Sequence, residues 1–189
     1  MAFVVIYDAC VLYPAPLRDL LLGLAAAGTV RARWTDAVLD ECFRNIHKDR
    51  PDRPPEKLAR TRDLMVQAVP DCLVTGYEGL IAGLKLPDPD DRHILAAAIR
   101  ANAQAIITFN LKDFPENVLV EYDIEAKHPD DFVVETIDLA QGAVVQTITE
   151  QVARLKAPPV TIPQLLDTLR EQRLVQSVAR LRGLWPPEV

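Results

Sequence analysis

Short apolar runs alternate with helix-like segments over the first two thirds of the chain. Residues 3–7, Phe-Val-Val-Ile-Tyr, are continuously apolar and rich in β-branched side chains, which is typical of a strand buried on both faces. The same reading predicts strands at 32–34, 72–74 and 104–109, and helices at 17–27, 35–46, 56–69, 78–84 and 90–102. This alternation predicts an α/β/α sandwich around a central parallel sheet.

The strand pattern ends near residue 128. From there on the apolar spacing is helical, and we expect helices at 130–154, 162–171 and 174–181. The sequence therefore predicts two parts: an α/β domain over residues 1–128 and a helical extension over residues 129–189 that packs on it.

The composition fits one globular protein with a substantial core. The chain has 189 residues, of which 49% are hydrophobic and 25% are charged. It contains no uncharged apolar run of about eighteen residues and no signal-peptide pattern, so we expect no membrane association and a cytoplasmic location. The three cysteines, Cys10, Cys42 and Cys72, are widely spaced and predict reduced, mostly buried thiols rather than disulfides or a zinc site.

The charge is unevenly distributed along the chain. The net charge of -6 argues against a protein that coats nucleic acid. Between Arg44 and Arg62, however, seven Lys or Arg face three acids. This segment is either a solvated surface or a region that steers a polyanion. The candidate RNA contacts are Arg44, Lys48, Arg50 and Arg53.

Several acids stand where an α/β protein places its site. Asp8 ends the first strand and Asp113 follows the strand predicted at 104–109. In a parallel sheet, ligands bind beyond the carboxyl ends of the strands, although either residue alone could be a turn or cap aspartate. Glu41 is expected on a helix, within reach of the same edge.

The sequence Pro87-Asp-Pro-Asp-Asp adds three more acids at a helix start. Asp88 and Asp91 are three residues apart and are expected to share one face, whereas Asp90 is expected to point elsewhere. Carboxylates that converge repel one another unless a cation neutralises them. Mg²⁺ and Mn²⁺ prefer such oxygen ligands and serve phosphodiester hydrolysis.

The ordered acids resemble the PIN-domain family, and within it the VapC-type toxin ribonucleases of type II toxin-antitoxin systems. The resemblance covers roughly residues 3–125 and rests on Ile-Tyr-Asp-Ala-Cys-Val-Leu with Asp8, on Glu41 in an early helix, on Asp91 before an Ala-rich helix, and on Thr-Phe-Asn-Leu-Lys-Asp-Phe with Asp113. The helical extension from about residue 129 departs from the shortest toxins of this type.

The resemblance implies a metal-dependent endoribonuclease. It would cleave single-stranded RNA to leave a 3′-hydroxyl and a 5′-phosphate, with Mg²⁺ or Mn²⁺ as cofactor. Asp8, Glu41, Asp91 and Asp113 would be the catalytic and metal-binding acids, with Asp88 as a further candidate ligand and Asn110 in support. A cognate antitoxin protein and a homodimer are the implied partners.

Other functions stay open. A phosphohydrolase or receiver fits less well, because Asp8 is followed by Ala9 and Cys10 rather than by a second acid. A PIN-like module that binds RNA or protein without catalysis is the main alternative. No spacing pairs a thiol with a base, and His93 is expected on the protein surface, away from its helix's apolar face. The aromatic side chains of Trp34, Tyr77 and Phe109 are expected in the core.

Overall fold

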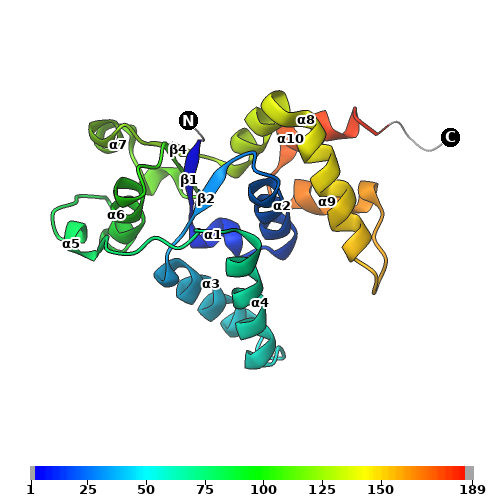
Figure 1. Cartoon of the computed structure of the whole chain (residues 1–189), viewed down its shortest axis with the longest axis horizontal. Helices are drawn as coiled ribbons and strands as arrows, with labels where there is room; N and C mark the ends of the chain where they lie inside the picture. Colours follow the sequence, from blue (N-terminus) through cyan, green and yellow to red (C-terminus); the bar gives the residue numbers. More distant parts are fainter. Residues whose placement is uncertain (1–2, 186–189) are drawn as a thin grey trace. The chain divides into compact units, whose positions relative to one another are not determined.

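The computed structural model describes residues 3–185, and these form two compact units (Figure 1). The first unit consists of the chain up to Tyr13 together with Val30–His128. The second consists of Pro14–Thr29 and the chain from Pro129 onward. The second unit thus combines the C-terminal helices with an early segment that lies in the predicted 1–128 domain.

The first unit contains four strands among short helices. In chain order its elements are β1 (Val4–Tyr7), α1 (Ala9–Leu12), β2 (Arg31–Arg33), α3 (Asp36–Asp49), α4 (Pro55–Ala68), α5 (Glu78–Ile81), the 3₁₀ helix η1 (Pro89–Asp91), α6 (Arg92–Arg100), β3 (Ala105–Ile107), η2 (Leu111–Asp113), α7 (Glu116–Leu119), η3 (Val120–Tyr122) and β4 (Glu125–Lys127).

All four strands pair in parallel, in the order β2-β1-β3-β4. Helix α6 packs against β1 and β3, and the interior residues of both strands are fully buried. The α/β fold with a central parallel sheet flanked by helices is confirmed. From β1 the chain continues to β2 on one side, while β3 lies on the other, so the strand order reverses between β1 and β3. Ligands in such sheets bind at this reversal, beyond the carboxyl ends of the strands.

The core contains most of the expected side chains. Trp34 is fully buried and stacks on Tyr7, with ring centroids 6.2 Å apart, and Tyr77 is also buried. Phe109 is only half-buried, so its expected place in the core is wrong. It packs edge-on against His128.

Two predicted elements differ from the structure. Residues 72–74 form one parallel bridge, from Leu73 to Trp34, rather than a strand. The predicted helix at 90–102 begins instead with η1, a 3₁₀ turn, and continues as α6. Strand β4 was not predicted, because its sequence Glu-Ala-Lys has no apolar alternation.

The second unit is helical. Its elements are α2 (Ala15–Ala26), α8 (Pro129–Arg154), α9 (Ile162–Glu171) and α10 (Val175–Arg182), and the three C-terminal helices agree with the prediction. Helix α2 packs against α8 and α9. Gly23 makes this possible, since a Cβ there would lie 2.4 Å from Cγ2 of Thr147 on α8. The packing of the extension on the first domain stays a prediction.

A buried carboxylate joins two helices of this unit. Asp130, at the start of α8, accepts hydrogen bonds from the backbone N–H groups of Gln176 and Ser177 at 2.8 Å each. It also accepts the Ser177 hydroxyl at 2.5 Å. Asp130 therefore caps the first turn of α10, whose N–H groups would otherwise lack partners.

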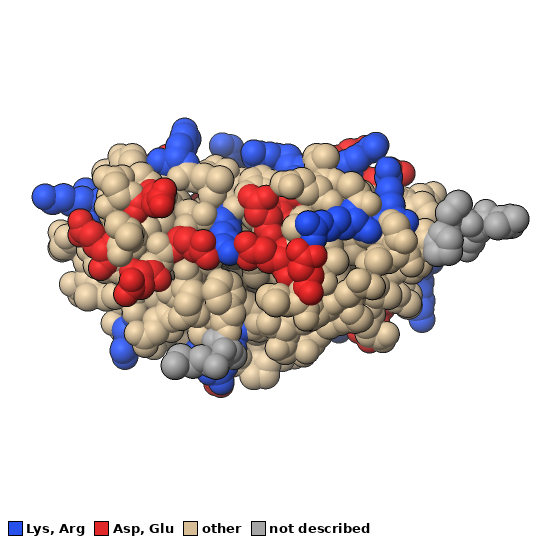
Figure 2. Space-filling view, turned by 90° about the horizontal axis from the view of Figure 1, so that it is seen from above, with Lys and Arg blue, Asp and Glu red and all other residues tan. Residues whose placement is uncertain are grey.

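The surface carries acidic and basic side chains in separate groups. On the face shown in Figure 2, Asp and Glu gather in clusters, with Lys and Arg between and around them. Within residues 3–185, no helix is long and apolar enough to cross a bilayer.

Candidate active site

An acidic pocket opens in the first unit beside the loop that follows β3. Its volume is about 690 Å³. It is lined by Ala37, Asp40, Glu41, Arg44, Asn45, Asp88, Asp90, Asp91, His93, Asn110 and Asp113. Six of these eleven residues are acids, and they come from separate segments of the chain. We call this hollow the acidic pocket.

Asp8 stands at the carboxyl end of β1 and is not among the residues that line the pocket, although its charge acts on Asp91 and Glu41. It is only 5% exposed, and its Oδ2 accepts the Thr108 hydroxyl at 2.7 Å and the Cys10 thiol at 3.1 Å. The Thr108 hydroxyl in turn accepts the backbone N–H of Asn110 at 3.0 Å. These bonds hold the Asp8 carboxylate in one orientation, at the reversal between β1 and β3.

Thr108 was not predicted as a site residue, although it contacts Asp8. The strand register could have revealed it, because Tyr7 pairs with Ile107 and their successors, Asp8 and Thr108, then lie side by side.

Glu41 reaches the pocket from α3. Thr35 caps this helix as predicted, accepting the Val38 N–H at 3.1 Å, and the apolar face of α3 is buried. Glu41 lies on the opposite, half-buried side. Asp40 also lines the pocket, but it is paired with Arg62.

The acids before α6 enter through η1. Asp88 accepts the backbone N–H of Asp90 at 2.9 Å and so caps the 3₁₀ turn. Asp91 is half-buried, and α6 is anchored behind it by a row of fully buried side chains. The expectation that Asp90 points elsewhere is wrong, because all three acids line the pocket.

The electrostatics of Asp91 show that these acids influence one another. Burial and four neighbouring carboxylates raise its pKa to about 7. In order of their effect, the four neighbours are Asp8, Asp88, Asp113 and Glu41.

Glu41 follows the same pattern. Burial and then the Asp8 carboxylate raise its pKa, while the Arg44 guanidinium opposes the rise. The four acids predicted as a group therefore share one electrostatic environment.

His93 belongs to the pocket, which corrects its predicted place on the surface. It is half-buried on the first turn of α6, and its Nδ1 is buried without a hydrogen-bond partner among the described residues. Burial lowers the pKa of His93, although the carboxylates of Asp8 and Asp90 oppose this. The 3₁₀ turn before α6 changes the angular position of residues 88–91 relative to the helix. Placing these residues on an ideal α-helix therefore gives their side chains the wrong direction.

The basic candidates are divided among three places. Arg44 lines the acidic pocket. Lys48 is exposed on α3, while Arg50 and Arg53 line a separate hollow at the turn between α3 and α4.

The predicted metal ligands are gathered but not in coordinating positions. Among residues 3–185, no three His, Cys, Asp or Glu side chains lie close enough together to hold a metal ion. The chemistry of the donors nevertheless suits a hard cation, since they are carboxylates whose charges disfavour one another. Their role as metal ligands stays a prediction.

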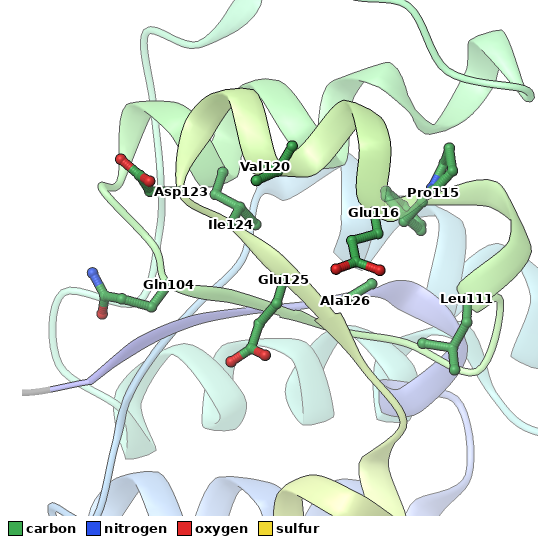
Figure 3. A pocket seen from close by; sticks show the side chains of 10 residues that line it. Gln104, Leu111, Pro115, Glu116, Val120, Asp123, Ile124, Glu125 and Ala126 are labelled. Carbon is green, nitrogen blue, oxygen red and sulfur yellow. The ribbon is translucent and has the colours of Figure 1, made fainter.

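Another pocket of the first unit lies beside the edge strand β4 (Figure 3). Its volume is about 620 Å³, and Figure 3 shows Leu111, Val120 and Ile124 beside the acids Glu116 and Glu125. Its lining includes no Lys, Arg or His among the described residues. It therefore lacks the mixture of cation, imidazole and converging acids found in the acidic pocket.

Comparison with known proteins identifies the class to which this fold and site belong. A family model described as "PIN domain" matches residues 4–112, more than half of the chain. The chain belongs to the PIN-domain family, and the resemblance drawn from its acids is confirmed. A second model, "VapC50 C-terminal domain", matches residues 129–183.

A curated relative agrees with both matches. The chain is similar to "Putative ribonuclease VapC50" of Mycobacterium tuberculosis (strain ATCC 25618 / H37Rv), with 44% identity over 111 residues. The alignment covers 59% of this chain and 64% of the relative, which is less than two thirds of its length. No solved structure matches the chain significantly.

Proposed function

We propose that this protein is a metal-dependent endoribonuclease and the toxin of a toxin-antitoxin pair. It would hydrolyse phosphodiester bonds of single-stranded RNA to leave a 3′-hydroxyl and a 5′-phosphate. The observation that carries the proposal is the acidic pocket, where burial and the carboxylates of Asp8, Asp88, Asp113 and Glu41 together raise the pKa of Asp91. Membership of the PIN-domain family and the name of the curated relative support it.

The residues that would hold Mg²⁺ or Mn²⁺ are Asp8, Glu41, Asp91 and Asp113, with Asp88 as a further candidate. Their oxygen donors match the preference of both ions. The chemistry that such an ion supplies when bound is polarisation of the phosphate and activation of a water for in-line attack.

The protein's own groups would orient the reactants. Thr108 and Cys10 fix the direction of the Asp8 carboxylate through the bonds to its Oδ2. Arg44 offers a guanidinium on a wall where six of the eleven residues are acids, and it can bind phosphate oxygens. The amide of Asn110, which also lines the pocket, can donate to or accept from the RNA.

The test is cleavage of total cellular RNA by the purified protein with Mg²⁺ or Mn²⁺, beside a sample with EDTA. Asp8→Asn is the decisive variant, because an amide oxygen can still accept the Thr108 hydroxyl while the charge is lost. Asp63→Asn is the matched control, since Asp63 is exposed on α4 and lines none of the pockets described.

We expect metal-dependent cuts with the wild type and Asp63→Asn, and none with Asp8→Asn. If Asp8→Asn cleaves at the wild-type rate, the site assignment is wrong. If no divalent metal supports cleavage by the wild type, the protein is instead a PIN-like binding module.

The partners belong to the same proposal. A cognate antitoxin should relieve growth arrest when it is expressed together with this protein, and a homodimer should appear at twice the monomer mass in light scattering. Both follow from the toxin assignment.

A further inference from the structure

A third hollow of the first unit lies at the turn between α3 and α4, and cations dominate its wall. Its volume is about 320 Å³. It is lined by Arg50, Asp52, Arg53, Pro54, Lys57, Leu58 and Thr61. Figure 1 shows this turn at the lowest point of the view, where α3 and α4 meet. We call this hollow the basic pocket.

Two of its three cations form no ion pair with another described residue. Arg50 is held by Asp52, which accepts from Nε and Nη2 at 2.9 Å each. Arg53 and Lys57 are exposed, and neither forms an ion pair within residues 3–185. The basic pocket thus presents two exposed cations outside the Arg50–Asp52 ion pair, on a protein whose net charge is -6.

Helix α3 connects the basic pocket to the acidic pocket. Glu41, Arg44 and Lys48 follow one another at spacings of three and four residues, so they share one side of the helix. Arg44 is the one Lys or Arg among the described residues that line the acidic pocket. Lys48 lies about 6 Å further along the axis, and the basic pocket begins just beyond the last turn. Arg44 and Lys48 therefore lie on the helix that links the two pockets.

We infer that the basic pocket is a second phosphate-binding subsite, in which Arg53 and Lys57 bind the backbone of the RNA strand whose scissile phosphate lies at the acidic pocket. The inference rests on the proposed ribonuclease function. A single strand carries one charge per nucleotide and follows grooves where cations neutralise it. The described lining includes no aromatic side chain, so the pocket suits the backbone rather than a stacked base.

The test uses single-stranded RNAs that share one cleavage site. They are lengthened one nucleotide at a time from about four to about sixteen nucleotides, on the 5′ side in one series and on the 3′ side in the other. For the wild type, kcat/KM should rise when the strand becomes long enough to reach the basic pocket.

The double variant Arg53→Gln/Lys57→Gln should lose this rise. We expect a loss of about three- to tenfold in kcat/KM on long RNAs, through KM, and wild-type cleavage of the shortest RNA. The slope of the logarithm of the binding constant against the logarithm of the salt concentration should become less negative by up to about 1.4. The matched control is Arg31→Gln/Lys85→Gln, which removes the same charge from exposed positions outside all three pockets and should behave as the wild type.

Several outcomes would overturn the inference. Equal losses on short and long RNAs, or an equal loss in the control, would mean a general effect of charge. An unchanged RNA profile together with lost binding of a polyglutamate peptide would assign the pocket to an acidic protein partner.

A binding assay separates this inference from the proposed function. Fluorescence anisotropy of the same RNAs is measured with Mg²⁺ in the Asp8→Asn background, with and without the Arg53 and Lys57 substitutions. If the Asp8→Asn protein shows the length step in binding but the wild type never cleaves RNA, the nuclease proposal fails and the subsite stands. If the wild type cleaves without any length step, only the subsite fails.

Discussion

Replacing Asp91 by Asn should stabilise the metal-free protein. The Asp91 carboxylate is half-buried among four others, and its pKa is raised to about 7. Because the folded state disfavours its ionised form, ionisation of Asp91 opposes folding. The amide has nearly the same shape and carries no charge, so it removes this cost.

The size of the gain follows from the pKa. A carboxyl group that titrates near 4 in the unfolded chain and near 7 in the folded one would correspond to about 4 kcal/mol at neutral pH. Since Asp91 is half-exposed and water screens its neighbours, we expect about 1–2 kcal/mol. For a chain of this length, that is a rise of about 2–8 °C in Tm.

The pH dependence has a definite sign. The ionisation of Asp91 costs no folding free energy below the pKa of the unfolded chain, which is near 4. This cost grows as the pH rises and is complete above about 7. The advantage of Asp91→Asn in EDTA should therefore be small at about pH 5 and large at about pH 8. In excess Mg²⁺ the wild type should become more stable than Asp91→Asn, because a ligand that binds only the folded wild type stabilises it by mass action.

The assay is thermal unfolding followed by circular dichroism in EDTA, with Asp63→Asn as the control. A variant that is no more stable than the wild type at about pH 8 would show that these carboxylates do not repel one another as described. An equal gain in Asp63→Asn would trace the effect to net charge instead.

Two further predictions concern single contacts. Thr108→Val keeps the shape of the side chain but removes the hydroxyl that donates to Asp8, so kcat should fall at least about tenfold. The control Thr108→Ser keeps the hydroxyl and should retain activity. Unchanged cleavage by the valine variant would exclude a positioning role for Thr108. Gly23→Ala brings a methyl group against Thr147 and should lower stability by about 1–3 kcal/mol in denaturant unfolding. Adding Thr147→Ser removes the clashing Cγ2 and should recover the loss, and failure of this rescue would contradict the close approach.

Sequence reasoning located the acids because strong local signals surround them. A buried apolar strand ends at Asp8, and Thr35 caps the helix that carries Glu41. Parallel pairing then brings residues that follow β1 and β3 to one edge of the sheet. The order of these signals along the chain also sufficed to indicate the family.

The remaining features depend on geometry that a linear pattern does not carry. The 3₁₀ turn at Pro89–Asp91 changes the angular position of Asp90 relative to α6, so Asp90 was placed on the wrong side. His93 lies within α6, and it lines the pocket together with residues of α3 and of the loop after β3, which are distant in the sequence. Strand β4 is only three residues long and owes its conformation to pairing with β3. Helix α2 was recognised as a helix, but its apolar face does not reveal which segment will cover it.

The grouping of α2 with the C-terminal helices affects the order in which the protein can fold during synthesis. Leu17, Leu20, Leu21 and Leu24 are fully buried, and the helices that pack on α2 in its own unit, α8 and α9, are translated more than a hundred residues later. Because synthesis begins at the amino end, α2 lacks its packing partners α8 and α9 while the segments around the sheet are synthesised. A chain that ends before residue 129 therefore lacks the helices that complete the second unit.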